Sequence, residues 1–218
     1  MAIEREKILD EAMALLNEVG LDQLTTRRLA QRLGVQQPAL YWHFRSKSVL
    51  LDELKEMMLL RFHAHRLPRP GEDWEAFTLA NARSFRHALL AVRDGARINA
   101  GTRPTVSQFG DAEGQLKLYV DAGFTAEAAL HISIAVARYV VGFVLEEQAE
   151  RERDEPTEPG TEPLEEIARF PLLSEAITPL VEAGAINSEA VFEGGLGYLV
   201  AGIRASLPAK AKRKKTKA

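Results

Sequence analysis

Apolar residues recur at helical spacing along most of the chain. Near the beginning, Ile8, Ala12, Leu16 and Val19 lie three or four residues apart, which places them on one face of a helix. Gly20 follows directly, and glycine is a typical C-terminal stop because it adopts the left-handed conformation readily. The pattern therefore predicts a first helix that ends at this glycine.

Two further short helices, joined by a glycine, are predicted after the first. Thr25 or Thr26 can cap the earlier one, because a threonine hydroxyl accepts a hydrogen bond from a free backbone N–H. Gly34 provides the tight turn, which needs a positive φ. The later helix is expected to start near Gln36 with Pro38 in its first turn, where the missing N–H of proline does no harm.

The rest of the chain also has helical periodicity, and no segment alternates convincingly at the period of a β-strand. Ser46 is predicted to cap the fourth helix. Further helices are expected near residues 73–91, 93–98 (a short piece), 105–121, 125–149, 163–182 and 188–206. The sequence therefore predicts an all-α fold.

We expect this all-α fold to have two parts. Residues 1–47 are predicted to form an N-terminal helix-turn-helix domain of three helices, and residues 48–208 a larger helical core. Residues 151–162 are rich in Pro, Glu and Thr, which predicts a mobile loop within the core. Residues 209–218 are basic and low in complexity, which predicts a disordered tail.

Composition narrows the class of protein. Hydrophobic residues make up 46% of the 218 residues and charged residues 27%, an ordinary balance for a soluble globular protein. The chain contains no cysteine, which excludes disulfide and thiolate chemistry. We find no signal-peptide core and no apolar run that approaches the roughly 20 residues that span a bilayer. A cytoplasmic protein without a membrane partner is therefore expected.

The helix–glycine–helix arrangement is the layout of a helix-turn-helix motif. Its second helix is predicted to turn Leu40 and Phe44 inward. It presents outward Gln37, Pro38, Tyr41, Trp42 and His43. Such a surface suits the major groove of DNA, where glutamine can pair with adenine and apolar groups can touch a thymine methyl. The alternative is a helical hairpin whose aromatic side chains merely pack within the protein.

Local charge favours the DNA interpretation although total charge does not. The net charge of the chain is -3, which gives no support for a nucleic acid partner. Between residues 22 and 47, however, Asp22 is the single acid. The basic residues of this segment are Arg27, Arg28, Arg32, Arg45 and Lys47. A local basic excess beside a polar and aromatic helix is typical of a DNA-binding surface.

Four stretches together resemble the TetR family of transcriptional repressors, and within it the tetracycline-responsive members. They are LTTRRLAQRLGVQQPALYWHFRSKSVLL, HALLAVRDGARINAGTRPT, GQLKLYVDAGF with Gln115, and GFVLEEQ with Glu146. The helix-turn-helix implies only the broad family, whereas GTRPT with its flanking matches in register is more specific. The resemblance extends to about Leu207. It implies a repressor that binds double-stranded operator DNA as a homodimer and leaves it when a small-molecule inducer binds to the core.

The resemblance also implies roles for individual residues of the DNA-binding domain. Arg27, Gln37 and Pro38 match base-reading positions. The positions at or near contacts with the DNA backbone are Thr25, Thr26, Tyr41, Trp42, His43 and Lys47. Ala39 stands where the tetracycline-responsive repressors have a threonine that helps to hold a phosphate, so weaker operator binding or a shifted sequence preference is expected.

In the core, the resemblance implies a drug pocket formed by His63, Asn81, Phe85, Asn99, Thr102, Arg103, Pro104, Gln115 and Glu146. The drug of these relatives arrives as a magnesium chelate. By the resemblance, His63, Asn81 and Gln115 would hydrogen-bond the drug. Asn99 would take the metal-ligand position. Thr102 and Glu146, the latter from the partner subunit, would hold magnesium-bound waters, an arrangement that suits an ion that prefers oxygen donors and retains waters.

One departure from the family pattern falls on the metal position. Asn99 stands where the family has a histidine that binds magnesium directly. An amide oxygen can ligate Mg²⁺, but it is a weak, neutral donor and cannot be switched by a proton as histidine can. Two outcomes stay open: a reduced affinity for the metal chelate, or a different, metal-free inducer that is an antibiotic or a metabolite.

Dimer formation is predicted through the helices near 125–149 and 188–206. The second of these contains five small residues, Gly194, Gly195, Gly197, Ala201 and Gly202. Small residues let helices approach closely, and the resemblance implies that these two helices build a four-helix dimer bundle. The alternative is that both helices are buried within one subunit.

Two alternative functions, an enzyme and a DNA-architectural protein, have less support from the sequence. His63 and His65 lie two residues apart and would point to different faces of a helix, and Glu146 beside Glu147 is equally explained as a solvated face. Because no nucleophile or acid–base pair accompanies them, the chain is not predicted to be an enzyme. A DNA-architectural protein without a ligand is the other alternative.

Overall fold

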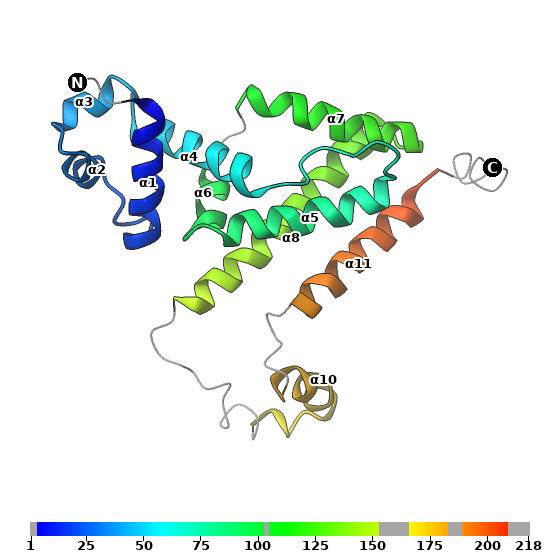
Figure 1. Ribbon diagram of the computed structural model, residues 1–218. Helices are drawn as coiled ribbons and strands as arrows, with labels where there is room; N and C mark the ends of the chain where they lie inside the picture. The colour runs from blue at the N-terminus through cyan, green and yellow to red at the C-terminus, as the bar shows by residue number, and fades with distance from the viewer. Residues whose placement is uncertain (1–3, 103–104, 153–165, 183–188, 209–218) are drawn as a thin grey trace.

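The structure, a computed structural model, describes residues 4–102, 105–152, 166–182 and 189–208. Its secondary structure within these ranges is entirely helical, which confirms the all-α prediction (Figure 1). The helices are α1 (Arg5–Val19), α2 (Thr26–Leu33), α3 (Gln37–Tyr41), α4 (Lys47–Phe62), α5 (Trp74–Leu90), α6 (Gly95–Gly101), α7 (Ser107–Ala122), α8 (Ala126–Arg151), α10 (Pro171–Glu182) and α11 (Glu189–Ser206).

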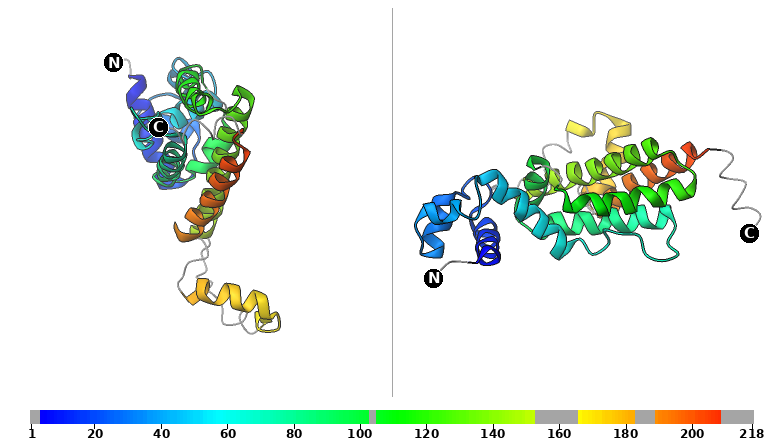
Figure 2. Two further views of the ribbon diagram at one scale, coloured as in Figure 1. Left: turned by 90° about the vertical axis from the view of Figure 1, so that its right-hand side faces the viewer. Right: turned by 90° about the horizontal axis from the view of Figure 1, so that it is seen from above.

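The first three helices pack around a small apolar centre that includes Ile8, Leu16, Leu29 and Leu40, each at most 2% exposed. Helix α1 contacts α2, and α2 contacts α3. These helices lie at one end of an elongated molecule, and α11 ends near the other (Figure 2). The N-terminal end is thus a separate surface, distant from the C-terminal end of the core.

Local capping explains where these helices begin and end. The Thr25 hydroxyl accepts a hydrogen bond from the N–H of Arg28 at 3.2 Å, so this threonine, and not its neighbour, is the cap. Gly34 adopts the left-handed conformation with φ 67°, as the turn requires. The predicted cap at Ser46 is also present, because its hydroxyl accepts from the N–H of Val49 at 3.3 Å.

Helix α3 is shorter than the aromatic segment suggested. It begins with Pro38 in its first turn and ends at Tyr41, so that Trp42 and His43 lie in the following turn. A guanidinium from α1 stabilises this turn, because Arg5 donates to the His43 carbonyl oxygen at 2.7 Å. The side chains expected to face outward therefore come from a helix and a turn together.

Helix α4 connects the N-terminal helices to the core. It contacts α1 on one side and α5 and α6 on the other. Arg5 pairs with Glu53 and Arg61 with Asp10, which fastens α4 to α1 at two points. The boundary placed at residue 47 stays a prediction, since this helix contacts both parts of the chain.

Helix α8 is the central helix of the core and packs against α5, α6, α7 and α11. Val136, Val140 and Val144 are buried along its inner face. Between α5 and α8, Arg86 forms a two-pronged ion pair with Glu147, and its guanidinium lies 4.8 Å from the ring centre of Phe192. Of the two neighbouring glutamates, Glu147 is therefore a buried structural residue.

The expectation that no segment is long and apolar enough to span a bilayer was wrong for α8. An 18-residue window of this helix has a mean hydropathy of 1.8, and 28% of that window is buried inside the chain. The central helix of a soluble bundle passes the same test of length and composition. The buried part of α8 packs against four neighbouring helices, and the described residues of this chain leave the rest of the apolar window uncovered.

Helix α10 lies apart from the bundle (Figures 1 and 2) and has no buried side chain. A helix was expected near 163–182; residues 166 and 167 are helical, and α10 begins only at Pro171. Most of the loop predicted at 151–162 lies outside the described residues, whereas Arg151 still belongs to α8. The tail predicted at 209–218 also lies outside them.

A sharp corner between α5 and α6 joins the core to the N-terminal helices. Asp94 adopts a left-handed conformation with φ 58°, and its carboxylate accepts from the N–H of Leu21 at 2.7 Å. The next residue, Gly95, passes so close to the end of α5 that an added Cβ would lie 2.2 Å from the Leu89 carbonyl oxygen. Glycine is therefore required by space at this corner.

We predict that Gly95→Ala destabilises the protein by roughly 1–3 kcal/mol, because the backbone must shift to accommodate the methyl group. Chemical denaturation followed by circular dichroism measures the change in the free energy of unfolding. Gly101→Ala is the matched control in the same helix, since an added Cβ there meets nothing within 4 Å. Equal stability of Gly95→Ala and the control would contradict the prediction.

Candidate functional site

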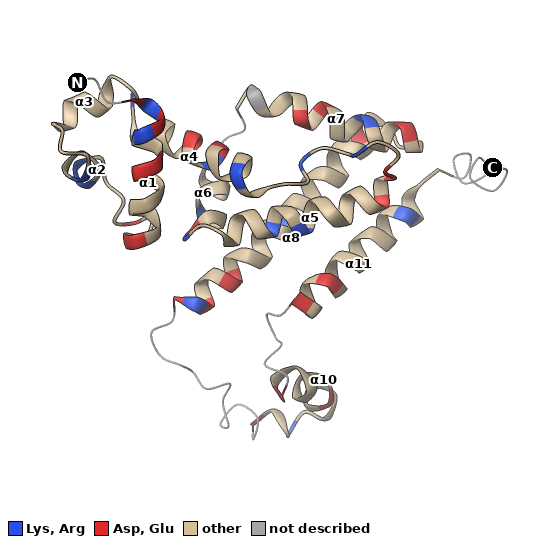
Figure 3. Cartoon of the chain, viewed as in Figure 1, with Lys and Arg blue, Asp and Glu red and all other residues tan. Residues whose placement is uncertain are grey.

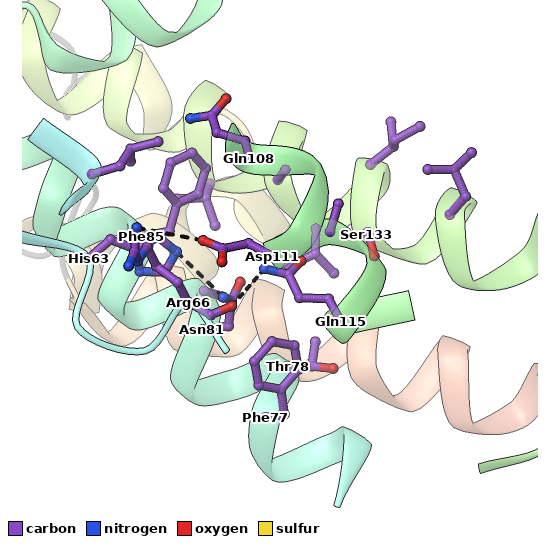
Figure 4. Close-up of a pocket in the computed structure, with 18 of the residues that line it drawn as sticks. His63, Arg66, Phe77, Thr78, Asn81, Phe85, Gln108, Asp111, Gln115 and Ser133 are labelled. Atoms are coloured by element: carbon purple, nitrogen blue, oxygen red, sulfur yellow. Dashed lines mark hydrogen bonds and ion pairs between the residues drawn. The ribbon is translucent and has the colours of Figure 1, made fainter. Parts of the chain in front are cut away.

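The core contains a cavity of about 670 Å³ between α4, α5, α7 and α8. This volume suits a drug-sized molecule. Most of the wall is apolar and includes Leu59, Phe77, Phe85, Leu130 and Val140. Polar groups gather on one side, where the loop after α4 meets α5 and α7 (Figure 4). The cavity can thus bind an apolar body and orient it through one polar edge.

His63 is fixed at this polar edge by several contacts. Its Nδ1 lies 2.9 Å from the Ser84 hydroxyl, and its ring stacks on Phe85 with 5.4 Å between centroids. Asn81 lies 3.4 Å from the other ring nitrogen and donates to the His65 carbonyl oxygen at 2.8 Å. The imidazole therefore has one orientation at the cavity wall, and each ring nitrogen already lies within hydrogen-bond distance of a side chain of this protein.

The environment of His63 keeps its imidazole neutral. Burial is the largest cause and, with the nearby charges of Arg66 and His65, lowers the pKa of His63 from 6.5 to about 4. A neutral imidazole has one donor and one acceptor nitrogen. At neutral pH, this residue thus serves the cavity as a polar, uncharged group.

The two histidines of the H-x-H pair do not lie on a helix, as the spacing argument assumed. Helix α4 ends at Phe62, and both histidines are in the loop that follows. The backbone N–H of His65 donates to the Ser84 hydroxyl at 3.0 Å, the same hydroxyl that contacts His63. The His65 ring instead pairs with Glu72 at 2.9 Å. Within the described ranges, no three His, Cys, Asp or Glu side chains form a metal-binding group.

Gln115 lies at the same polar edge, but its side chain forms a hydrogen bond within the protein. Its side-chain N–H donates to the carbonyl oxygen of Arg66 at 2.7 Å, which ties α7 to the loop after α4. Asp111, one turn earlier on α7, faces the guanidinium of Arg66 at 3.6 Å. The structure thus brings four of the expected ligand residues to the cavity wall, namely His63, Asn81, Phe85 and Gln115.

The expected metal residues are not part of this wall. Asn99 and Thr102 lie at the end of α6 and are absent from the cavity lining, as is Glu146, which is exposed on α8. The Thr102 hydroxyl donates to the Ile98 carbonyl oxygen at 2.9 Å. Arg103 and Pro104 lie outside the described residues. Among the described residues, the single chain therefore brings only part of the residue set that the family pattern implies to this cavity.

On the N-terminal helices, the candidate DNA-binding residues differ in exposure. Trp42 is 90% exposed and Tyr41 46%, too large and too open for packing residues of a simple hairpin. The Gln37 side chain donates to the Thr26 hydroxyl at 2.8 Å, which joins α3 to the start of α2. Arg27, Thr25 and Pro38 are exposed, and Ala39, His43 and Lys47 are half-buried.

The basic excess of this region is smaller than the sequence suggested. Arg32 pairs with Glu11 at 2.7 Å and Glu18 at 2.6 Å, and these acids come from α1, outside the counted segment. The hydrogen bond from Arg32 also lowers the pKa of Glu18. Helix α3 itself carries no charged side chain. Arg27, Arg28 and Arg32 lie on α2 (Figure 3), whereas Arg45 lies in the turn after α3 and Lys47 begins α4. Among the described residues, Arg27 and Arg45 have no side-chain partner, so they remain available to phosphates or bases.

Sequence reasoning missed several residues that line the cavity or hold its lining side chains in place. Ser84 organises both histidines, and Arg66 and Asp111 place a pair of opposite charges in the wall. No local signal marks these residues, because they come from three separate segments. The Thr78 hydroxyl contacts the Tyr119 hydroxyl at 2.7 Å in the cavity wall, and neither residue stands out in the sequence.

Comparison with known proteins agrees with this arrangement. Residues 8–54 match the family described as bacterial regulatory proteins of the tetR family, and residues 67–207 match the tetracyclin repressor-like C-terminal domain. The chain is 50% identical over 201 residues to the tetracycline repressor protein class A from transposon 1721 of Escherichia coli, with 92% of this chain and 90% of the relative covered. It is 47% identical over 202 residues to the class C repressor of the same species, with coverage of 92% and 90%.

Solved structures show the same fold. TetR from Acinetobacter baumannii AYE is 42% identical, with a TM-score of 0.73 and coverage of 95% of this chain and 100% of that one. TetR(class A) in complex with 5a,6-anhydrotetracycline and magnesium is 41% identical, with a TM-score of 0.72 and coverage of 93% and 99%.

We predict that His63 makes the protein sensitive to acid. The pKa of His63 is about 4 in the folded protein, below the ordinary 6.5. Between these pH values, the unfolded chain therefore binds a proton at His63 that the folded chain does not bind. The free energy of unfolding therefore falls as pH drops from 6.5 to 4, by on the order of 3 kcal/mol from this group. Denaturation at several pH values should show that the free energy of unfolding declines less steeply with falling pH in His63→Gln than in the unchanged protein.

The exposed His131 on α8 provides the control for this experiment. His131→Gln is expected to keep the acid sensitivity of the unchanged protein. If His63→Gln and His131→Gln decline equally steeply between pH 6.5 and 4, burial of neutral His63 is not a source of the sensitivity.

Proposed function

Since the chain belongs to the tetR family of bacterial regulatory proteins, we propose that it is a cytoplasmic, non-enzymatic repressor that binds operator DNA as a homodimer and is released by a magnesium–tetracycline chelate. The observation that carries the proposal is the combination of an exposed aromatic helix-turn-helix surface with a drug-sized cavity in the core. The tetracycline part is supported by the names of the relatives and by the solved complex with anhydrotetracycline and magnesium.

In this proposal, α3 enters the major groove. Gln37, Pro38 and Arg27 read bases, because glutamine and arginine can each form two hydrogen bonds with a purine edge. Contacts with the DNA backbone come from Thr25, Thr26, Tyr41, Trp42, His43 and Lys47. Gln37 is held by Thr26 in the free protein, so its amide is oriented before DNA arrives. Ala39 supplies no hydroxyl for a phosphate.

A second copy of the chain is proposed to pack against α8 and α11. The outer face of α11 presents Gly194, Gly197 and Ala201, and an added Cβ at either glycine meets nothing within 4 Å. Tyr198 on the same face is 82% exposed. An apolar face of small residues allows close helix packing, and two copies of the DNA-binding domain can read two half-sites.

The C-terminal end of α6 offers oxygen donors for a magnesium ion bound to the drug. Asn99 and Thr102 are three residues apart, so they share one side of the chain at that end. Among the described residues, the Asn99 side chain makes no hydrogen bond, which leaves its amide oxygen available. Thr102 donates its hydroxyl hydrogen to a backbone carbonyl, which leaves oxygen lone pairs that can accept from a metal-bound water. This donor set fits a hard ion that prefers oxygen and keeps waters.

Within the proposed complex, Asn99 would ligate the ion, and Thr102 and the partner subunit's Glu146 would hold its waters. His63, Asn81 and Gln115 would hydrogen-bond the polar edge of the drug, and Phe85 would pack beside it. Arg103 and Pro104 complete the residue set by the same family pattern. For Gln115 to reach the drug, its amide has to leave the Arg66 carbonyl oxygen.

Release from DNA is proposed to follow a shift between two arrangements of the domains. The α5–α6 corner holds the α1–α2 loop through Asp94 and through Arg97, which pairs with Asp22 at 2.8 Å. Helix α4 runs from the DNA-binding part to His63 at the cavity. A ligand that favours one position of α6 and α4 therefore changes the population of dimers whose recognition helices match the operator spacing.

For DNA binding, we predict that Arg27→Ala lowers the preference for operator over random DNA by roughly tenfold or more, because a base contact of 1–3 kcal/mol is lost. The operator would first be selected from a pool of random DNA with the unchanged protein. Lys47→Ala should instead weaken binding to both DNAs similarly and reduce the salt dependence by about one ion. Equal losses on both DNAs in Arg27→Ala would exclude base reading by this residue.

For the inducer, we predict that the purified protein binds tetracycline in Mg²⁺ and loses most of that affinity in EDTA. Titration followed by tetracycline fluorescence measures both values. Asn99→Ala should weaken binding in Mg²⁺ and leave binding in EDTA unchanged, because the amide acts only through the ion. Affinity that is the same in Mg²⁺ and EDTA would exclude the metal, and absence of binding would assign the inducer to another chemical class.

A further inference from the structure

The cavity wall contains one feature that the proposed drug contacts do not use. Arg66, in the loop after α4, lies 3.6 Å from the carboxylate of Asp111 on α7. The two side chains are 32% and 30% exposed, and both residues line the cavity (Figure 4). A positive and a negative charge are therefore both accessible to a molecule in the cavity.

The backbone of Arg66 is firmly held, whereas its side chain is not. The Arg66 carbonyl oxygen accepts from Gln115 at 2.7 Å, and the preceding residue, His65, is held through Ser84 and Asn81. The guanidinium makes only the 3.6 Å contact with Asp111 within the described part of the chain. This arrangement fixes the base of the side chain and leaves its charged end free to turn.

Other arginines of the core are bound much more closely. Arg83 makes two hydrogen bonds to Glu193 at 2.6 and 2.7 Å, and Arg86 is paired in the same two-pronged way with Glu147. A guanidinium has five N–H donors in a planar fork, which suits two parallel bonds to a carboxylate. Arg66 has the same chemistry but lacks such a partner, so its donors remain available to a ligand.

We propose that Arg66 binds an acidic group of the inducer, and that Asp111 is its resting partner, which the ligand displaces. The ligand class is a largely apolar ring molecule that carries one carboxylate or similarly acidic group. This inference rests on the proposed function, since it concerns the same cavity and names the charge of the molecule that fills it.

The surroundings favour an anion at this point over a cation at Asp111. The positive charge of Arg66 reaches the inner wall, where it contributes to the low pKa of His63 after burial, the larger cause. The other acid of the lining, Glu56, accepts a hydrogen bond from the Thr105 hydroxyl at 3.3 Å. Most of the remaining wall is apolar, and a ligand charge that enters it needs a partner of opposite sign.

Two fluorescent probes with the same aromatic body test the proposal. Anilinonaphthalene sulfonate carries an anionic group, and N-phenyl-1-naphthylamine is the same molecule without it. Arg66→Gln is expected to weaken the sulfonate probe by about tenfold or more, as for a lost hydrogen bond to a charged group. It should change the neutral probe less than about twofold. Asp111→Asn should strengthen the sulfonate probe severalfold, because it releases the guanidinium.

Two further variants make the result specific to the cavity. Arg83→Gln removes an arginine that does not line the cavity and should change neither probe. Ala112→Trp places a large side chain on the α7 wall and should weaken both probes if they occupy this cavity. Equal weakening of the sulfonate probe by Arg66→Gln and Arg83→Gln, or weaker binding in Asp111→Asn, would overturn the proposal.

Release from operator DNA by tetracycline is measured on the same variants. If tetracycline does not release the unchanged protein from operator DNA, the proposed inducer is wrong. The comparison of the two probes still decides whether Arg66 binds an anion. Loss of the sulfonate preference in Arg66→Gln supports both proposals if this variant also needs more tetracycline for release from operator DNA than the unchanged protein does. Unaltered sulfonate preference in Arg66→Gln rejects the anion site and leaves the proposed function in place.

Discussion

The buried carboxylate of Asp94 joins the two parts of this chain, and the rest of the arrangement depends on it. It is only 4% exposed, yet it accepts from the Leu21 N–H at 2.7 Å and from Arg97 at 2.8 Å. A buried charge is costly unless its hydrogen bonds are made, so these partners are tightly specified. The left-handed backbone of Asp94 and the close passage of Gly95 aim the carboxylate at the α1–α2 loop.

This corner is also tied to the central helix of the core. Gln148 of α8 donates to the carbonyl oxygens of Leu89 and Val92 and accepts from the Ala96 N–H. The cavity is lined by residues of the same α5 and α8, so the cavity and the α5–α6 corner are connected through these two packed helices. A ligand can alter DNA binding only through a difference in its affinity for two arrangements. The corner is where such a difference can be converted into a movement of the recognition helices.

The parts of the fold that could be predicted are those determined by neighbouring residues. Thr25, Gly34 and Ser46 act within one helical turn, and the capping and turn conformations that the structure gives them follow from local geometry. The features that the sequence did not predict depend on residues far apart in the chain. Arg32 looked available in its own segment and is neutralised by α1. The same limit applies to the cavity, because Ser84 and Asp111 gain their importance only from what tertiary packing places beside them.

His63 and Arg66, both at the polar edge of the cavity, differ in how firmly their side chains are held, and this difference has a functional consequence. His63 is fixed by Ser84, Asn81 and the ring of Phe85, and its imidazole is neutral. Such an edge orients a ligand without selecting its charge. The Arg66 guanidinium has a single long contact and carries a full charge. Because the loop after α4 connects the two residues directly, a ligand that engages Arg66 also acts on the end of the helix that leads to the DNA-binding surface.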